Sequence, residues 1–260
     1  MKKDFKKDES LMVEWDRQTK SNLSSMEMYI ALSENSQDST LSKLDNFAKY
    51  TRRQALSKFL ARTEIFSNIL EVHGSILDFG VNAGQSLFTW AQISAIREPL
   101  NYTRSIVGFD TFEGFPSLSD KDFNKMNSSE HLKQGGFNYG NIDGLNEAIS
   151  AYDANRFLSH IPKIELVKGD IKKTLPIYIK ENPHMIVSLL HLDMDLYEPT
   201  KLALELILPK MPKGAIIVFD ELNQKPYPGE TLALVDSVGI NALKIKRFTW
   251  ETGLSYAFIE

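Results

Sequence analysis

Acidic side chains stand in two pairs, each at the end of an apolar run. The stretch HLDMDLYEPT places Asp193 and Asp195 directly after MIVSLL, and the stretch AIIVFDELN ends with Asp220 and Glu221. Four carboxylates brought together would repel one another and raise one another's pKa values, and a divalent cation removes that conflict. Carboxylate oxygens suit Mg²⁺ or a similar ion. The pairs therefore predict a metal site; the alternative is that each acid caps the helix that follows it.

The two pairs differ in how they can converge. Side chains at positions i and i+2 of a strand share a face, so we expect Asp193 and Asp195 to point the same way. Asp220 and Glu221 are adjacent, and they can meet one ion only if the chain turns at the strand end. His191 lies inside the apolar run, and we interpret it as a packed core histidine rather than as a ligand.

A glycine turn in LDFGVNAGQS is the candidate cofactor site. Gly80 and Gly84 stand between an expected strand and a helix that begins near Gln85. Glycine lets the backbone approach a ligand closely, and a helix N-terminus offers free N–H groups. Asn82 replaces the second glycine of the dinucleotide fingerprint, which disfavours an NAD site. The spacing suits S-adenosylmethionine (SAM), so we assign Gly80, Gly84, Gln85 and Ser86 to a SAM-binding turn.

Four further polar residues are candidates for ligand binding. Asp110 ends SIVGFD and could accept both hydroxyls of a ribose, or it could be a helix cap or turn former. Asp170 in VKGDIKKTLP could accept from an adenine amino group, although we prefer it as the cap of a helix starting at Ile171. Tyr50 and Arg53 in KYTRRQ could hold a carboxylate or pyrophosphate of the substrate, or form a solvated helix face.

Strands alternate with helices from residue 74 onwards. We expect strands in SILDFGV, SIVGFD, IELVKGD, MIVSLLHLD and AIIVFDE, and helices in GQSLFTWAQISAI, IKKTLPIYIKEN, PTKLALELILPKM and GETLALVDSVG. Apolar runs without clean alternation predict strands buried on both faces, and the alternation predicts an α/β fold with a doubly wound, mostly parallel sheet. LKIKRF and LSYAFIE are expected to pair antiparallel at one edge. Ligands bind such sheets beyond the carboxyl ends of the strands, where the acids stand.

The N-terminal part is expected to be a separate helical region. We divide the chain into a helical extension or cap over 1–70, whose first ten residues look solvated, and a catalytic domain over 71–260. Residues 110–140 interrupt the alternation with Pro, Ser, Asn and Gly. Long loops of this kind are often lids or binding loops, so we interpret the segment as a lid-like insertion rather than a disordered one. Five aromatic residues could pack it: Phe112, Phe115, Phe123, Phe137 and Tyr139.

Composition narrows the class of protein. The 260 residues are 42% hydrophobic and 25% charged, carry a net charge of −4 and include no cysteine, which excludes disulfides and thiol nucleophiles. The start, MKKDFKKDES, lacks the apolar region of a signal peptide, and no apolar run approaches the ~20 residues that span a bilayer. We expect a cytoplasmic protein that acts on a small molecule and binds neither nucleic acid nor membranes.

Taken together, the motifs resemble the macrocin O-methyltransferase family of metal-dependent sugar methylases. The resemblance runs from about Leu44 to the C-terminus and rests on DFGVNAGQS, GFDTFEGFP, GDIKKTLP, HLDMDLYEPT and IIVFDELN…PGE. It implies a class I methyltransferase fold with a seven-stranded, Rossmann-like sheet, SAM as cofactor, Mg²⁺ or a similar ion, and a homo-oligomer. The first 43 residues match no motif.

The same resemblance implies roles for individual residues. Gly80 and Gly84 would line the methionine part of SAM, with Asp110 at the ribose and Asp170 at the adenine. The metal ligands would be Asp193, Asp220 and Glu221, and Asp195 would be the general base. The chain departs from the family's usual pattern twice: Asp78 stands where a glutamate is usual, and Glu221 where an aspartate is common.

The implied function is methylation of a deoxysugar hydroxyl, on a finished glycoside or on a nucleotide-linked sugar. One rival is a metal-dependent nucleotide-sugar glycosyltransferase, which the D-x-D at 193–195 would allow, although the glycine turn would then lack a purpose. A second rival is a non-catalytic subunit with a SAM-type fold, which would have no need to keep four repelling acids together.

Overall fold

The computed structural model describes residues 20–124 and 131–260, so the interpretation of residues 1–10 lies outside it. The chain divides into two compact units, Met1–Leu60 and Ala61–Glu260. This boundary lies ten residues before residue 70, where the sequence predicts the end of the helical extension. The first unit contains α1 (Lys20–Asn35), α2 (Thr40–Asp45), α3 (Phe47–Tyr50) and the start of α4 (Arg53–Ser67). The helical character expected for this part of the chain is confirmed over these ranges.

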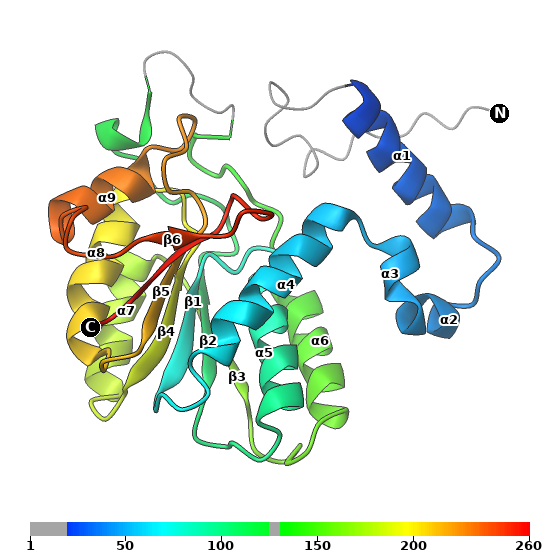
Figure 1. The fold of residues 1–260 in the computed structure, drawn as a ribbon, viewed down its shortest axis with the longest axis horizontal. Helices are drawn as coiled ribbons and strands as arrows, with labels where there is room; N and C mark the ends of the chain where they lie inside the picture. The colour runs from blue at the N-terminus through cyan, green and yellow to red at the C-terminus, as the bar shows by residue number, and fades with distance from the viewer. Residues whose placement is uncertain (1–19, 125–130) are drawn as a thin grey trace. The chain divides into compact units, whose positions relative to one another are not determined.

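The second unit is built on a seven-stranded sheet with the order β3-β2-β1-β4-β5-β7-β6 (Figure 1). Its strands are β1 (Ser75–Phe79), β2 (Ile106–Asp110), β3 (Ile164–Lys168), β4 (Val187–Leu192), β5 (Ile216–Phe219), β6 (Lys246–Arg247) and β7 (Ser255–Phe258). The first five pair in parallel, whereas β7 pairs antiparallel with β5 and with β6. The mostly parallel sheet and its antiparallel edge are therefore confirmed.

Helices cover both faces of the sheet, as a doubly wound fold requires. Figure 1 shows α5 (Gln85–Arg97) and α6 (Ile142–Ala154) on one face, and α7 (Ile171–Glu181), α8 (Tyr197–Ile207) and α9 (Gly229–Ser237) on the other. The four helices expected from the sequence are confirmed, but α6 was not anticipated. Only Leu145 and Tyr152 of α6 are buried, so its apolar signal is weak.

The central strands are buried on both faces, which explains their unbroken apolar sequences. Every residue of β4 and β5 is buried, including His191 within β4. One side of the core joins these strands to α7 and α8 through side chains such as Leu175, Leu204 and Ile207. Burying both faces places the polar ends of the strands, rather than their middles, in reach of ligands.

The segment 110–140 packs through aromatic side chains in the parts that the structure describes. Its ring contacts join Phe115, Phe137, Tyr139 and His131, and Phe137 also lies 6.1 Å, between ring centroids, from buried Tyr227. Phe112 is buried too, but Phe123 is 46% exposed and does not fulfil the packing expected of it. A role for the segment as a lid stays a prediction.

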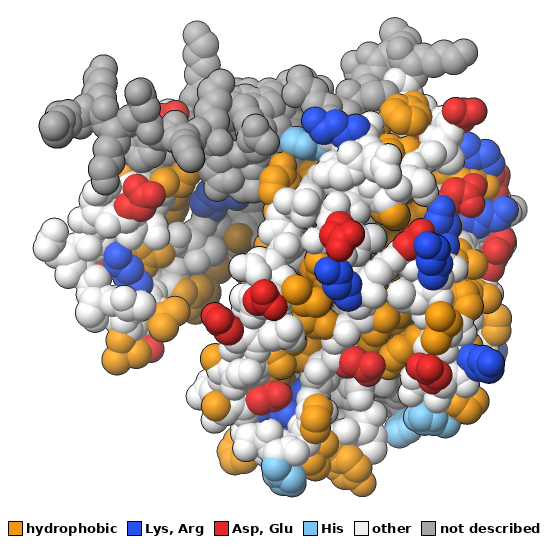
Figure 2. Space-filling view, turned by 180° about the vertical axis from the view of Figure 1, so that it is seen from behind, with side chains coloured by type: hydrophobic (Ala, Val, Ile, Leu, Met, Phe, Trp, Pro, Cys, Tyr) orange, Lys and Arg blue, Asp and Glu red, His pale blue; other side chains and the backbone are white. Residues whose placement is uncertain are grey.

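Charges of both signs are interspersed on the face of the second unit that Figure 2 shows from behind, with hydrophobic side chains between them. Among the described helices, none combines the length and the apolar character needed to cross a membrane. The concentrated negative charge of this protein lies elsewhere, at the carboxyl ends of β4 and β5.

Arg104 links chain segments at the end of the sheet where β1, β2 and β4 begin. This buried guanidinium donates to the backbone carbonyls of Ile69, Val72 and Gly74 over 2.9–3.0 Å, and also to the Ser188 hydroxyl. Its Nε lies 2.8 Å from Glu98 Oε1 as an ion pair, although this contact lacks hydrogen-bond geometry. One side chain thus joins the segment before β1, the start of β2 and β4.

Arg104→Met should therefore destabilise the protein by about 3–5 kcal/mol, because it removes the cation paired with the mostly buried Glu98 side chain and the donors to the carbonyls of Ile69, Val72 and Gly74. Urea unfolding at neutral pH measures the loss. The matched control is Arg97→Met at the exposed end of α5, which should change stability by less than about 0.5 kcal/mol. Equal stabilities of the two variants would contradict the role given to Arg104.

Candidate active site

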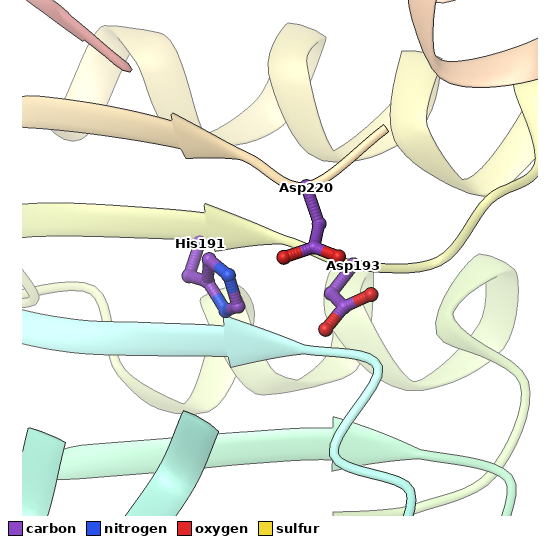
Figure 3. Close-up of side chains that lie close together, drawn as sticks. All are labelled: His191, Asp193 and Asp220. Atoms are coloured by element: carbon purple, nitrogen blue, oxygen red, sulfur yellow. The ribbon is translucent and has the colours of Figure 1, made fainter. Parts of the chain in front are cut away.

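The register of the sheet brings the two acidic motifs together. Leu192 pairs with Phe219 as the last residues of β4 and β5, so Asp193 and Asp220 come next on neighbouring strands. Their ligand atoms and one from His191 all lie within 4.8 Å of one another (Figure 3). Two of the three expected metal ligands are therefore placed side by side, with a histidine that was expected only to pack.

His191 is fully buried, and its two ring nitrogens have different surroundings. Nδ1 lies 2.5 Å from Asp78 Oδ1, whereas Nε2 has no hydrogen-bond partner. A carboxylate only accepts, so Nδ1 carries the hydrogen in this contact, and Nε2 is the nitrogen that remains for another partner. The interpretation of His191 as a packed core histidine accounts for Nδ1 only, and Nε2 could ligate an ion.

Asp78 holds this arrangement from within the sheet. It is fully buried, and its second oxygen, Oδ2, accepts a hydrogen bond from the Ser86 hydroxyl over 2.8 Å. Ser86, which is assigned from the sequence to the SAM-binding turn, therefore directs its hydroxyl to Asp78. A carboxylate behind a ligating histidine fixes the tautomer and the orientation of the ring.

Asp195 reaches the site by a turn rather than by the pleat of a strand. The expectation that Asp193 and Asp195 share a strand face is wrong, because β4 ends at Leu192. The backbone of Asp195 has a φ of 60°, an unusual conformation for a residue other than glycine. Such strain persists only where the surrounding structure imposes it, and it clusters at functional sites. Asp195 is partly exposed.

Glu221 and Glu230 extend the cluster of acids. The backbone N–H of Glu221 donates to Glu230 Oε1 over 3.0 Å, and the Oε2 atoms of both side chains are buried without a hydrogen-bond partner. Burial, and then the charges of neighbouring acids that include Asp195 and Asp220, raises the pKa of each carboxyl well above its usual value. Sequence analysis includes Glu230 as the last residue of the motif PGE but assigns it no role.

The structure contradicts the alternative in which these acids cap the following helices. Leu196 and Pro228 occupy the N-cap positions of α8 and α9, and neither makes a side-chain capping bond. The first N–H of α8, from Tyr197, instead donates to buried Asp122 of the 110–140 segment over 2.6 Å. The acids after β4 and β5 are therefore not used as helix caps.

A buried cation that the sequence did not reveal lies beside the acids. Arg62 on α4 is fully buried, and its Nη2 lies 3.8 Å from Asp220 Oδ1. Its Nη1 donates to Gln85 Oε1 over 3.4 Å. Arg62 thereby links the end of β5 to the first residue of α5. No local motif marks it, because it stands on a helix with ordinary spacing.

The glycine turn fits tightly against the end of β4. Gly80 has a φ of 90°, and a Cβ at this position would lie 1.8 Å from the carbonyl oxygen of Asp193. Glycine is therefore required for packing between the turn and the acidic motif. Gly84 is the N-cap of α5 with a φ of 90°, and Gln85 opens the helix as expected. Binding of SAM by these residues stays a prediction.

Asp110 and Asp170 both bind backbone N–H groups. Asp110 accepts from Asn82 over 2.8 Å and from Phe112 over 2.6 Å, which ties the glycine turn to the start of the 110–140 segment. Burial raises the pKa of its carboxyl. Asp170 caps α7 by accepting from Lys172 over 3.0 Å, so the preferred interpretation as a cap is confirmed. Their roles at ribose and adenine remain predictions.

The proposed substrate residues Tyr50 and Arg53 belong to the first unit, which is described by itself. The Tyr50 hydroxyl binds the Asp38 carboxylate and lies 2.8 Å from the Ser36 hydroxyl. Arg53 is the first residue of α4. These contacts account for Tyr50 within its own unit, and a role for either residue toward substrate is still a prediction.

Comparisons with known proteins agree with this geometry. The model of the family described as Macrocin-O-methyltransferase (TylF) matches residues 16–232. Two structures of the calicheamicin methyltransferase CalS11 are similar to this chain. One shares 32% identity with a TM-score of 0.88, covering 93% of each chain. The apo form, described as a TDP-rhamnose 3'-O-methyltransferase, shares 30% identity with a TM-score of 0.80, covering 93% of this chain and 95% of that one.

More distant similarity concerns the fold alone. The structure of the O-methyltransferase NovP shares 17% identity over 77% of this chain and 78% of its own, with a TM-score of 0.59. No curated protein sequence gives a significant match. The sheet order and these similarities confirm the class I methyltransferase fold. The chain therefore belongs to the macrocin O-methyltransferase family and is a SAM-dependent O-methyltransferase.

Proposed function

We propose that this enzyme methylates a hydroxyl group of a nucleotide-linked deoxysugar, with help from a divalent cation and a carboxylate general base. The observation that carries the proposal is the group formed by His191, Asp193 and Asp220 beside the glycine turn. The similarity to CalS11, which is described as a TDP-rhamnose 3'-O-methyltransferase, favours a nucleotide-linked acceptor over a finished glycoside. A cytoplasmic location and a homo-oligomeric state stay predictions.

The residues at the strand ends fit a divalent cation. They offer two carboxylates and a buried imidazole nitrogen without a partner, in a place where uncompensated negative charge is unfavourable. The carboxylates favour a hard ion such as Mg²⁺, and the imidazole also admits a transition metal. Glu221 lies outside this group of three, but the charges of Asp220 and Asp193 act on it, so we keep it as a candidate ligand.

Each part of the site has a task in methyl transfer. SAM supplies a methyl group already activated on sulfur, and a bound cation lowers the pKa of a hydroxyl that it coordinates. Asp195 accepts the proton from the sugar hydroxyl, and its partial exposure lets it reach the substrate. Asp193, Asp220 and His191 would hold the ion. General-base assistance of this kind contributes about 10²–10⁴ in rate.

The alternative function is a glycosyltransferase that uses the D-x-D at 193–195. The family match and the methyltransferase sheet order disfavour it. The same match supports a SAM-binding role for the glycine turn, which would have no purpose in a glycosyltransferase.

The central experiment replaces the proposed base. Asp195→Asn should lower kcat about 10²–10⁴-fold with little change in KM for a dTDP-linked deoxysugar, because the amide cannot accept the proton. Steady-state methyl transfer from labelled SAM measures both constants. Glu198→Gln, an exposed acid at the start of α8, is the matched control and should keep normal turnover. Near-normal kcat in Asp195→Asn would remove the role of base.

A second prediction concerns the ion. At about 100 times its dissociation constant, Mg²⁺ or Mn²⁺ should raise the Tm of chelator-treated protein by about 5–10 °C, because it binds only the folded state. Asp193→Asn should lose most of this shift, and Glu198→Gln should keep it. Turnover of the wild type should stop in chelator and return with the ion; undiminished turnover without metal would contradict the proposal.

A third prediction concerns pH. Burial raises the folded-state pKa of Glu230 above its unfolded value, so the folded protein binds this proton more tightly. Stability from this group is fully present below about pH 4.5 and is lost as pH rises through the folded-state value. In chelator, Glu230→Gln should thus be more stable than the wild type at pH 8 and gain little at pH 4.5, measured by urea unfolding. A larger gain at pH 4.5 would refute this sign.

A further inference from the structure

Arg62 is a buried cation whose donors are only partly used. A guanidinium offers five N–H donors, but Nε and Nη2 of Arg62 have no hydrogen-bond partner. Its hydrogen bond to Gln85 Oε1 is long, at 3.4 Å, and its ion pair with Asp220 spans 3.8 Å. Buried polar groups are normally satisfied, so these free donors indicate a binding site that a ligand completes.

A second feature favours an anion at the same place. Arg62 contacts Gln85, the first residue of α5, and the helix begins there without a side-chain cap and without an acid in its first turn. The free N–H groups and the dipole of a helix N-terminus favour negative charge. The cation and the helix start therefore converge on one position between the glycine turn and the end of β5.

The chemistry of this position selects the kind of anion. Because Arg62 is fully buried, the anion must be small and must be the end of a molecule that otherwise lies outside the core. A carboxylate matches the guanidinium fork with two parallel hydrogen bonds. The nearby acids Asp193 and Asp220 would repel a carboxylate that had no such counter-charge.

We propose that Arg62, together with the start of α5, binds the α-carboxylate at the amino-acid end of SAM. This inference rests on the proposed methyl-transfer function and adds a binding residue to it. A purely structural role, in which Arg62 only neutralises Asp220, is the competing explanation. The two explanations differ in whether the effect of Arg62 depends on the amino-acid end of the ligand.

The experiment compares two ligands by isothermal titration calorimetry at a fixed Mg²⁺ concentration. S-adenosylhomocysteine has the amino-acid end, and 5′-methylthioadenosine keeps the adenosine and the sulfur but lacks that end. Arg62→Met should weaken binding of S-adenosylhomocysteine about 10- to 100-fold, the usual effect of losing a charged hydrogen bond. It should leave the affinity for 5′-methylthioadenosine within about twofold of the wild type.

Two further variants make the result decisive. Arg62→Lys, which keeps the charge and loses the fork, should lie between the wild type and Arg62→Met for S-adenosylhomocysteine alone. Arg97→Met, at the exposed end of α5, should bind both ligands normally. Equal losses for the two ligands, or an unchanged affinity for S-adenosylhomocysteine, would overturn the role of Arg62. A wild type that binds neither ligand would overturn the proposed function and this inference with it.

Discussion

The repulsion between carboxylates at the ends of β4 and β5 is the constraint around which this site is organised. Because Leu192 pairs with Phe219, the residues that follow them, Asp193 and Asp220, must be neighbours. Separating them would require breaking the most buried part of the sheet, where every residue of both strands is buried. The buried apolar strands thus hold like charges close together, and a positive charge from another group is needed to offset their repulsion.

The 110–140 segment is tied to this constraint through the backbone. Asp122 is buried, and it accepts from the first N–H of α8, directly after the strained turn at Asp195. Nearby, Gly229 leaves room for both, since a Cβ there would lie 2.5 Å from Asp122 Oδ1 and 2.7 Å from the Asp195 carbonyl oxygen. The described part of this segment, which includes a short 3-10 helix at Asp120–Asp122, therefore helps to fix the conformation of the proposed base.

Sequence patterns predicted the strands and the acids that follow them, but missed the site residues that are placed by contacts between distant parts of the chain. Apolar runs revealed the five parallel strands, and acids after those runs revealed Asp193 and Asp220, because both signals are contiguous in the chain. Arg62 stands on a helix with no local motif, and Glu230 stands in the motif PGE with no assigned role, because each reaches the site only through tertiary packing. The turn that places Asp195 could not be foreseen either, since its φ depends on neighbours far along the chain.

Asp78 stands where the family usually has a glutamate, and the structure shows what this shorter side chain contacts. Both oxygens of Asp78 are used inside the sheet, one on His191 and one on the Ser86 hydroxyl, so the shorter side chain acts on the site through the histidine. The contact with Asp78 fixes the orientation of the ring, whose Nε2 has no hydrogen-bond partner and which lies in one group with Asp193 and Asp220. Arg62 balances Asp220 from the other side. The core thus places a guanidinium and an oriented imidazole beside the acids at the ends of β4 and β5.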